Sequence, residues 1–374
     1  LNARHRFTLA ALAPIAYNLA IIGGALFLAA PFGVRGLAYG VVIGAALHFL
    51  VQVPGLVRAG MRYQPLHLDI QDEGAAEVAR LMPPRIIGQA AFQANLVVMT
   101  NIASSLPAGH FAALKYANLL MMLPHGVLAM SMATVLFPTM TAQVGRGDIA
   151  AMRATLAGGL RTLLFLTLPA AVLLGLLGRQ IVALLFQLGA FKQSSTELVA
   201  APLAAFAWGL VAYAVVEVLT RGFYALQDTR TPVMVSIATV VLNIGLSALL
   251  VFQFGMDNVG LALSLALTTS AEMIGLLLFL HRRLPGLFDR ATLRAAGISL
   301  LAAAAMAAVL VPLVPWLAAH VWAHPDDDLG TKVATGLILA VAGGVGGAVY
   351  LGIARLFRAE ELGAALRLLR RRSG

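Results

Sequence analysis

The sequence contains no cysteine, and only 11% of its 374 residues are charged. The absence of cysteine excludes a small secreted domain held together by disulfides. The scarcity of charge excludes an ordinary soluble domain, because about a quarter of the residues in such domains are charged. Hydrophobic residues make up 60% of the chain, which excludes a disordered protein. A mean hydropathy of +0.88 therefore indicates an integral membrane protein with many spans.

Long apolar runs account for most of the sequence. A helix needs about 20 mainly apolar residues to cross a bilayer. A transmembrane β-barrel would instead show segments of about ten residues with alternating polarity, and the sequence contains none. The sequence therefore predicts an all-α integral membrane protein with about ten transmembrane helices. Their expected ranges are 7–30, 36–57, 82–104, 111–140, 153–177, 196–225, 231–253, 259–281, 292–315 and 331–353.

The distribution of Lys and Arg predicts the orientation of these helices. Of the 26 cations, 19 fall in the connections on one side of the membrane and 4 in those on the other side. Because cytoplasmic connections are enriched in Lys and Arg, both ends of the chain are expected in the cytoplasm. This orientation explains the net charge of +10, so no nucleic-acid partner is expected.

An internal repeat relates the first two helices to the seventh and eighth. Asn18 corresponds to Asn243 at an offset of 225 residues, and Gly-Leu-Ala at 36–38 recurs at 260–262, an offset of 224. The repeating unit then has six helices, and both copies have the same orientation. The sequence therefore predicts the remainder of a fourteen-helix, two-lobe transporter, with four further helices expected before Leu1.

The repeat divides the chain into five parts. Residues 1–57 are expected to hold the last two helices of a first lobe, 58–81 a cytoplasmic linker, and 82–281 a complete six-helix lobe. Residues 292–353 are expected to form a terminal helix pair outside the repeat. The remainder, 354–374, is predicted to be a basic amphipathic tail that rests on the anionic inner leaflet.

Several short motifs connect the sequence to a known family. They include Pro124-His125-Gly126, Gly189-Ala190-Phe191 and RGFYALQDTRTP at 221–232. With these motifs the chain resembles the lipid II flippases of bacterial peptidoglycan synthesis, the MurJ/MviN family of the multidrug/oligosaccharidyl-lipid/polysaccharide exporter superfamily. The resemblance covers nearly the whole chain, and it implies the same two-lobe fold with the N-terminal part missing.

The resemblance also implies a function. The protein would move lipid II, a muropeptide linked to undecaprenyl pyrophosphate, from the inner to the outer leaflet by alternating access, and it would not be an enzyme. Its location would be the bacterial cytoplasmic (inner) membrane. Its partners would be lipid II, membrane lipids and cell-wall synthesis proteins. No cofactor is expected, and a coupling ion or the membrane potential would drive transport. The terminal pair would hold the lipid tail.

Two alternatives to this function remain open at the level of sequence. One is another transporter of the same superfamily, either a polysaccharide-lipid flippase or a cation-coupled drug exporter. The other is a non-transporting membrane scaffold of cell-wall synthesis. The family places an arginine where this chain has Leu119, and this departure is what favours the scaffold.

Cations inside the predicted helices are the candidate binding residues, since a charge within the bilayer is costly. Lys115 lies one turn before Leu119, and it is expected to replace the missing family arginine at the pyrophosphate. The alternative is that Lys115 extends to the membrane interface. Asn118, Arg85 and Arg161 complete the predicted substrate-binding set.

Two carboxylates inside the helices are predicted to be coupling or buried charges. Glu217 lies one turn before Arg221, so it is expected either to pair with a neighbouring cation or to carry a coupling proton. Glu272 has no cation within one turn on its own helix, and burial would favour its protonated form. No metal site is expected, because His320, His324 and Asp326–Asp328 are more typical of a solvated acidic loop.

Two further groups of residues are expected to affect how the helices pack together and where they bend. Asn18 and Asn243 are expected to form hydrogen bonds between helices. Pro124, Pro169 and Pro202 fall within predicted helices, where neighbouring groups can bond to the carbonyls that a proline leaves free. They are therefore predicted hinges for alternating access.

Overall fold

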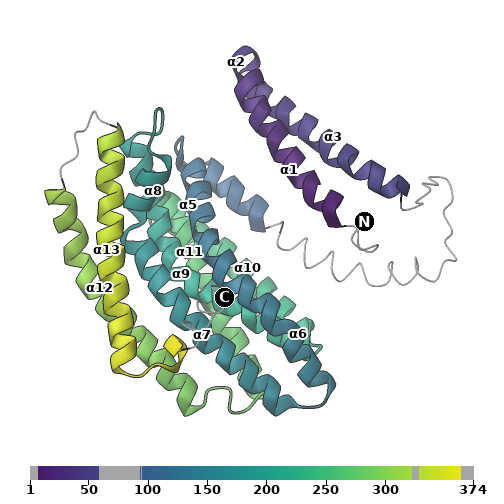
Figure 1. Cartoon of the computed structure of the whole chain (residues 1–374), viewed down its shortest axis with the longest axis vertical. Coiled ribbons are helices and arrows are strands. Elements are labelled where there is room, and N and C mark those ends of the chain that lie inside the picture. The colour runs from purple at the N-terminus through teal and green to yellow at the C-terminus, as the bar shows by residue number, and fades with distance from the viewer. Residues whose placement is uncertain (1–6, 59–92, 94, 322–327, 364–374) are drawn as a thin grey trace. The chain divides into compact units, whose positions relative to one another are not determined.

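The computed structural model describes residues 7–58, 93, 95–321 and 328–363, and these residues form helices joined by turns (Figure 1). Nine of the described helices are long and apolar enough to cross a membrane, which confirms the predicted all-α membrane fold. Of the remaining predicted span, 82–104, the helical part at 95–104 is described. The predicted linker 58–81 lies outside the described residues except for Arg58. The chain divides into two units, Leu1–Met82 and Pro83–Gly374.

The first unit contains a helical hairpin. Gly33 forms its turn with a φ of +57°, a backbone conformation that glycine adopts without strain. The arms of the hairpin are α1 (Phe7–Gly23), the π-helical turn η2 (Gly24–Leu28) and α2 (Ala29–Phe32) on one side, and α3 (Val34–Arg58) on the other.

Three glycines spaced one turn apart on α3 bring the arms of this hairpin together. They are Gly36, Gly40 and Gly44. A methyl group on Gly40 would lie 3.0 Å from the Cα of Gly24, and one on Gly36 would collide with the carbonyl group of Leu28. Small residues at a spacing of four allow helix backbones to approach closely in membranes. The hairpin is therefore held together by close backbone contact, and the rings of Tyr17 and His48 also meet across it, with their centres 6.3 Å apart.

The second unit contains the other helices. The span α5 (His110–Pro124), η3 (His125–Met130) and α6 (Ser131–Gly145) is continuous. It is followed by α7 (Ile149–Leu176), the short α8 (Gly178–Phe186), α9 (Gln193–Ala225), α10 (Arg230–Ala248) with η4 (Leu249–Gln253), α11 (Asp257–Arg283), α12 (Arg290–His320) and α13 (Asp328–Leu356).

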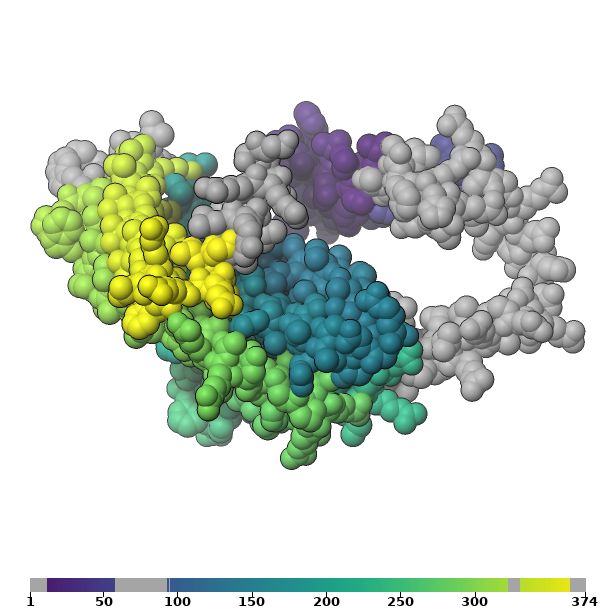
Figure 2. Space-filling model, turned by 60° about the horizontal axis from the view of Figure 1, so that its bottom comes forward, coloured from purple at the N-terminus to yellow at the C-terminus, as the bar shows by residue number. Residues whose placement is uncertain are grey.

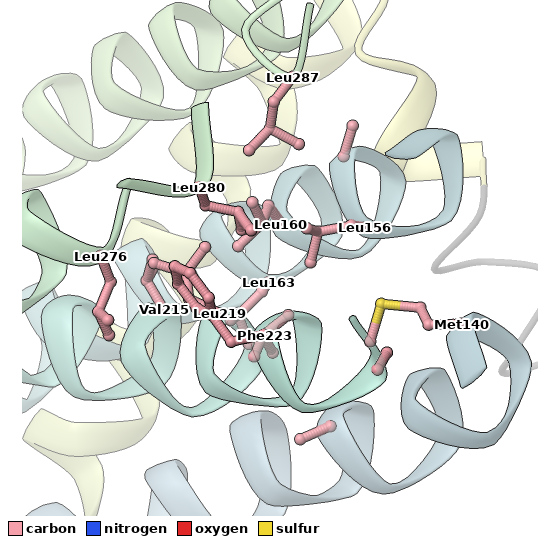
Figure 3. Close-up of a cluster of buried hydrophobic side chains, with 14 of the residues drawn as sticks. Met140, Leu156, Leu160, Leu163, Val215, Leu219, Phe223, Leu276, Leu280 and Leu287 are labelled. Atoms are coloured by element: carbon pink, nitrogen blue, oxygen red, sulfur yellow. The ribbon is translucent and has the colours of Figure 1, made fainter. Parts of the chain in front are cut away.

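Helix α9 is the central helix of this unit and packs against α5, α7 and α11. One buried cluster joins Phe223 of α9 to Leu160 of α7 and Leu280 of α11 (Figure 3). The closest approach is at Gly209, where a methyl group would lie 2.9 Å from the Cα of Ala266 in α11. A glycine in α9 therefore sets the separation between the two helices.

The terminal pair, α12 and α13, packs on α7 and α8 through a core of its own. This core contains Phe165 of α7, Met306 of α12 and Tyr350 of α13. The two helices of the pair lie in contact with each other, as the green and yellow surfaces show (Figure 2). The pair is thus attached to the rest of the unit mainly through α7.

A proline in α7 determines one of the contacts with the terminal pair. Pro169 has no N–H group, so it cannot donate to the carbonyl oxygen of Phe165 one turn earlier. The hydroxyl of Tyr350 in α13 donates to that oxygen instead, at 2.8 Å. The carbonyl that the proline leaves free is therefore bonded to a different helix.

Helix α9 repeats this arrangement. Pro202 leaves the carbonyl oxygen of Leu198 without its helical partner, and the side-chain amide of Asn258, at the start of α11, donates to it at 3.2 Å. At Pro124, by contrast, the chain continues into the π-helical turn His125–Met130. Of the three predicted hinges, Pro169 and Pro202 are therefore pinned by neighbouring helices.

Candidate substrate site

Lys115 lies on the exposed side of α5. The opposite side of this helix buries Ala113 and Ala117 against α9, and Leu119 is exposed together with Lys115. The ammonium nitrogen of Lys115 lies 5.3 Å from the centre of the Phe111 ring, within the range of a cation–π contact. No carboxylate among the described residues forms an ion pair with Lys115. This lysine is therefore available to bind an anion.

Asn118 is half-buried on α5, and the side chain of His125, further along the same span, is buried. His125 follows Asn118 by seven residues, a spacing that places both near one side of a helix. The ring of His125 lies edge-on to that of Tyr213 in α9, with the ring centres 6.0 Å apart. Its Nδ1 has no hydrogen-bond partner among the described residues. Polar groups of α5 and α9 thus meet inside the lobe.

A polar stripe runs along α9 at this point. Tyr213, Glu217 and Arg221 follow one another at intervals of one turn, so they share a face of the helix. The guanidinium of Arg221 donates to the carboxylate of Glu217 at 2.6 Å, and the two side chains are 33% and 24% exposed. His125 is close enough to Glu217 to interact with it electrostatically. Of the two roles expected for Glu217, the structure shows the ion pair.

Glu272 lies on the neighbouring helix α11, close enough to Tyr213 to interact with it electrostatically. Its carboxylate is hydrogen-bonded to the side chain of Ser236 in α10, and the hydroxyl of Tyr213 is bonded to Thr269. No cation forms an ion pair with Glu272 within the described part of the chain. The two predicted carboxylates therefore differ, because Glu217 has a cationic partner and Glu272 has none.

Arg161 lies apart from the residues of α5. It lines a small cavity of about 60 Å³ together with Arg294 of α12 and Arg358 beyond α13. This cavity groups Arg161 with the terminal pair rather than with Lys115 and Asn118. The position of Arg85 lies outside the described residues.

The DTRTP segment forms the junction between α9 and α10. The carboxylate of Asp228 accepts hydrogen bonds from the backbone N–H and the hydroxyl of Thr231, at 3.0 and 2.6 Å, and it pairs with Arg283 of α11 at 2.9 Å. Burial raises the pKa of Asp228, but the bonds from Thr231 and the charge of Arg283 outweigh burial and hold the pKa below its ordinary value. This motif therefore fastens helix ends together.

A second polar cluster joins α10 to α11. The amide of Asn243 donates to the hydroxyls of Ser264 and Thr268, at 3.4 and 3.2 Å, which confirms the interhelical hydrogen bonding expected of it. Asn18, its counterpart in the repeat, is exposed on α1. In the described ranges, no group of three or more His, Cys, Asp or Glu side chains could hold a metal ion. Most of the acidic connection after His320 lies outside those ranges.

Tyr213 was not among the predicted site residues, and His125 was named only as part of the Pro124-His125-Gly126 motif. The signal for the α9 stripe is the one-turn spacing of Tyr213, Glu217 and Arg221 within an otherwise apolar helix. The contact between His125 and this stripe joins two different spans, so no spacing along one helix could indicate it.

These helices define an all-helical, multi-pass membrane protein, and comparison with solved structures shows which fold it has. The chain matches a structure described as "Lipid II flippase MurJ, inward closed conformation" with a TM-score of 0.70. The match covers 92% of this chain and 68% of that chain, at 23% sequence identity. This likeness shows the fold.

Sequence comparison shows the family. The profile of the family "Lipid II flippase MurJ" matches residues 1–325. The "Probable lipid II flippase MurJ" of Rhizobium tropici is 32% identical over 383 aligned positions, which cover 100% of this chain and 69% of the relative. The "Lipid II flippase MurJ" of Burkholderia cenocepacia is 33% identical over 295 positions, 77% of this chain and 56% of the relative. The chain belongs to the MurJ lipid II flippase family, whose members are transporters rather than enzymes. The chain spans only 55–56% of the length of three curated relatives, among them the one from Burkholderia cenocepacia.

Proposed function

We propose that the protein takes part in moving lipid II from the inner to the outer leaflet of the bacterial cytoplasmic membrane, by alternating access. Membership of the flippase family supports this function. A pyrophosphate group cannot cross about 30 Å of hydrocarbon unaided, because removing its charge from water is too costly. A transporter of this lipid must therefore present cations and hydrogen-bonding groups to the head group.

Within the described part of the chain, this proposal depends on Lys115. The other cation near the interior polar groups, Arg221, is neutralised by Glu217, whereas Lys115 is exposed and forms no ion pair with any described carboxylate. Lys115 would bind the pyrophosphate as a point charge, without the two-pronged hydrogen bonding of an arginine. Asn118, beside it on α5, would contribute an amide.

Energy coupling and the lipid tail are assigned to two other places in the second unit. Glu272 is half-buried and forms no ion pair among the described residues, so it would carry a coupling proton. The terminal pair would accommodate the undecaprenyl chain. Membrane lipids and proteins of cell-wall synthesis complete the expected partners.

A complementation experiment tests the assignment of Lys115. The gene that carries this chain would be expressed in a bacterium depleted of its own lipid II flippase. Lys115→Ala should abolish growth at matched expression, whereas Lys192→Ala, which removes an exposed lysine elsewhere, should not. Adding Leu119→Arg to Lys115→Ala should restore growth, because it returns a cation to the same face of α5. Normal growth of Lys115→Ala would contradict the assignment.

A measurement of lipid II in the two leaflets distinguishes transport from a scaffold role. If the Lys115→Ala cells stop growing while lipid II reaches the outer leaflet at the parental rate, the protein acts as a scaffold of cell-wall synthesis. Loss of outer-leaflet lipid II supports transport.

The proposed orientation places both ends of the chain in the cytoplasm, as the excess of arginines on one side indicates. The absence of cysteine allows a direct test. A single cysteine introduced at Ser105 should react with a membrane-impermeant thiol reagent in whole cells, and one introduced at Gly147 should not. The opposite labelling pattern would reverse the orientation.

A further inference from the structure

Two adjoining cavities lie at the end of the second unit where α8 is found. The larger, of about 420 Å³, is lined by Leu176 of α7 and by Leu310 and Val314 of α12, together with Arg179 and Gln180 of α8. Its volume falls in the range of roughly 300–1,000 Å³ that is common for small-molecule sites. Its walls are largely apolar, so it suits a hydrocarbon chain.

The smaller cavity, of about 210 Å³, has a more polar lining than the larger one, although most of its wall is still apolar. It shares Arg179 and Gln180 with the larger cavity and is also lined by Gln187, Gln193 and Thr196. These residues come from α8, the turn that follows it and the start of α9. An apolar groove therefore leads to a group of polar side chains near helix ends, the arrangement expected of a site for a membrane lipid.

The polar groups at this junction define the head group that would fit. The side-chain oxygen of Gln180 is buried and has no hydrogen-bond donor among the described residues. Arg179 offers a cation, and its guanidinium lies 3.3 Å from the carboxylate of Glu197. That carboxylate also accepts a bond from the amide of Gln193 at 3.3 Å. The pocket thus presents a cation and an acceptor that lacks a donor, and the carboxylate of Glu197 lies beside the cation without lining the cavity.

We propose that these cavities bind a zwitterionic phospholipid with a primary ammonium group, phosphatidylethanolamine. The phosphate binds Arg179, the ammonium donates to Gln180 and lies beside Glu197, and an acyl chain lies along α12. Phosphatidylcholine has no N–H group to donate to Gln180. Phosphatidylglycerol has a donor but no cation to place beside Glu197, so it fits less well than phosphatidylethanolamine.

Native mass spectrometry of the purified chain in detergent tests this proposal. The probes are phosphatidylethanolamine, phosphatidylcholine and phosphatidylglycerol with the same acyl chains. Phosphatidylethanolamine should bind about tenfold more tightly than phosphatidylcholine, the effect expected of one charged hydrogen bond. Gln180→Leu should remove this preference. Gln253→Leu is the matched control, because Gln253 is exposed in η4, and it should bind like the parent.

A second pair of variants covers the case in which Gln180→Leu fails to fold. Glu197→Gln should lower the preference for phosphatidylethanolamine without changing a residue that lines either cavity. Ala318→Trp should abolish binding of all three phospholipids, because Ala318 lines both cavities and an indole would fill their junction. Each variant should keep the parental melting temperature.

Three outcomes would overturn the proposal. The first is equal binding of phosphatidylethanolamine and phosphatidylcholine by the parent protein. The second is a preference for phosphatidylethanolamine that persists in folded Gln180→Leu and Glu197→Gln. The third is displacement of phosphatidylethanolamine from the parent protein by equimolar undecaprenyl phosphate, together with loss of undecaprenyl phosphate binding in Ala318→Trp, which would assign the groove to a polyprenyl lipid.

Discussion

Helices α9 and α10 show that hydropathy and burial are separate properties in this protein. The mean hydropathy of α9 is 2.0 and that of the α10 span is 2.3, yet 61% of the first segment is buried and only 17% of the second. The more hydrophobic helix is therefore the less buried one. Lipid tails are as apolar as leucine, so apolar surface alone does not drive helices together within a bilayer.

The difference lies mainly in a small residue that lets α9 approach its neighbour, and α9 also carries an ion pair of its own. Helix α9 brings Gly209 against α11 and carries the Glu217–Arg221 pair. Helix α10 presents large side chains such as Met234 outward, at 70% exposure, and its Gly245 faces open space. Because α10 also has hydrogen bonds to α11 through Asn243, close backbone contact is the feature that distinguishes the central span.

The largest expected effect comes from replacing Gly209. In Gly209→Leu, the new Cβ would lie 2.9 Å from the Cα and Cβ of Ala266, and a backbone atom cannot move aside as a flexible side chain can. Overpacking of this kind costs about 1–3 kcal/mol or more. Gly245→Leu on α10 is the control, since no atom lies within 4 Å of its added Cβ. Thermal unfolding in detergent should show a lower melting temperature for the α9 variant only, and equal melting temperatures would contradict this account.

Breaking the ion pair of α9 should have the next largest effect. Glu217→Leu leaves Arg221 without its partner inside the lobe. Loss of one partner costs about 3–5 kcal/mol for a fully buried pair, and about half of that is expected here because both side chains are partly exposed. Removing Arg221 as well should restore part of the stability. A double variant that is as unstable as the sum of the two single variants would show that the pair is not coupled.

Pro202 supplies a third test of the same comparison. In α10, Pro232 lies in the first turn, where no helical hydrogen bond is lost, whereas α9 needs Asn258 to bond to the Leu198 carbonyl. Asn258→Leu should cost about 1–2 kcal/mol, measured as a lower free energy of unfolding. Adding Pro202→Ala returns an N–H group to α9 and should reduce that cost. An unchanged cost would rule out this role for Asn258.

The smallest effect is expected at the junction of the two helices. Asp228 accepts hydrogen bonds from Thr231 and pairs with Arg283, so Asp228→Asn, which removes the charge, should cost about 1 kcal/mol at pH 7. Since the pKa of Asp228 is lowered by folding, its charge stabilises the protein above the unfolded pKa of about 3.9. That stabilisation is lost as the pH falls through the lower folded value. The melting temperatures of parent and variant should therefore converge below about pH 4, and a constant difference down to pH 3 would contradict this.

The spans could be predicted well from the sequence because each span is recognised by the hydropathy of its own residues. The predicted span 111–140 corresponds to helix from His110 to Gly145, and 292–315 lies within Arg290–His320. The environment of Arg161 was not predictable in the same way. Its neighbours Arg294 and Arg358 come from distant parts of the chain, and hydropathy contains no information about which helix faces which.

The Pro169 contact also has a genetic consequence. Phe165 and Tyr350 are separated by 185 positions, and the bond between them exists because Pro169 lacks an amide hydrogen. With Tyr350→Phe alone, the carbonyl loses its donor. With Pro169→Ala alone, α7 recovers its own bond, and the carbonyl oxygen can still accept from Tyr350 through its second lone pair. Made together, the two changes leave every group bonded. The two positions should therefore be linked in one direction, in which Tyr350→Phe alone is harmful and Pro169→Ala suppresses it.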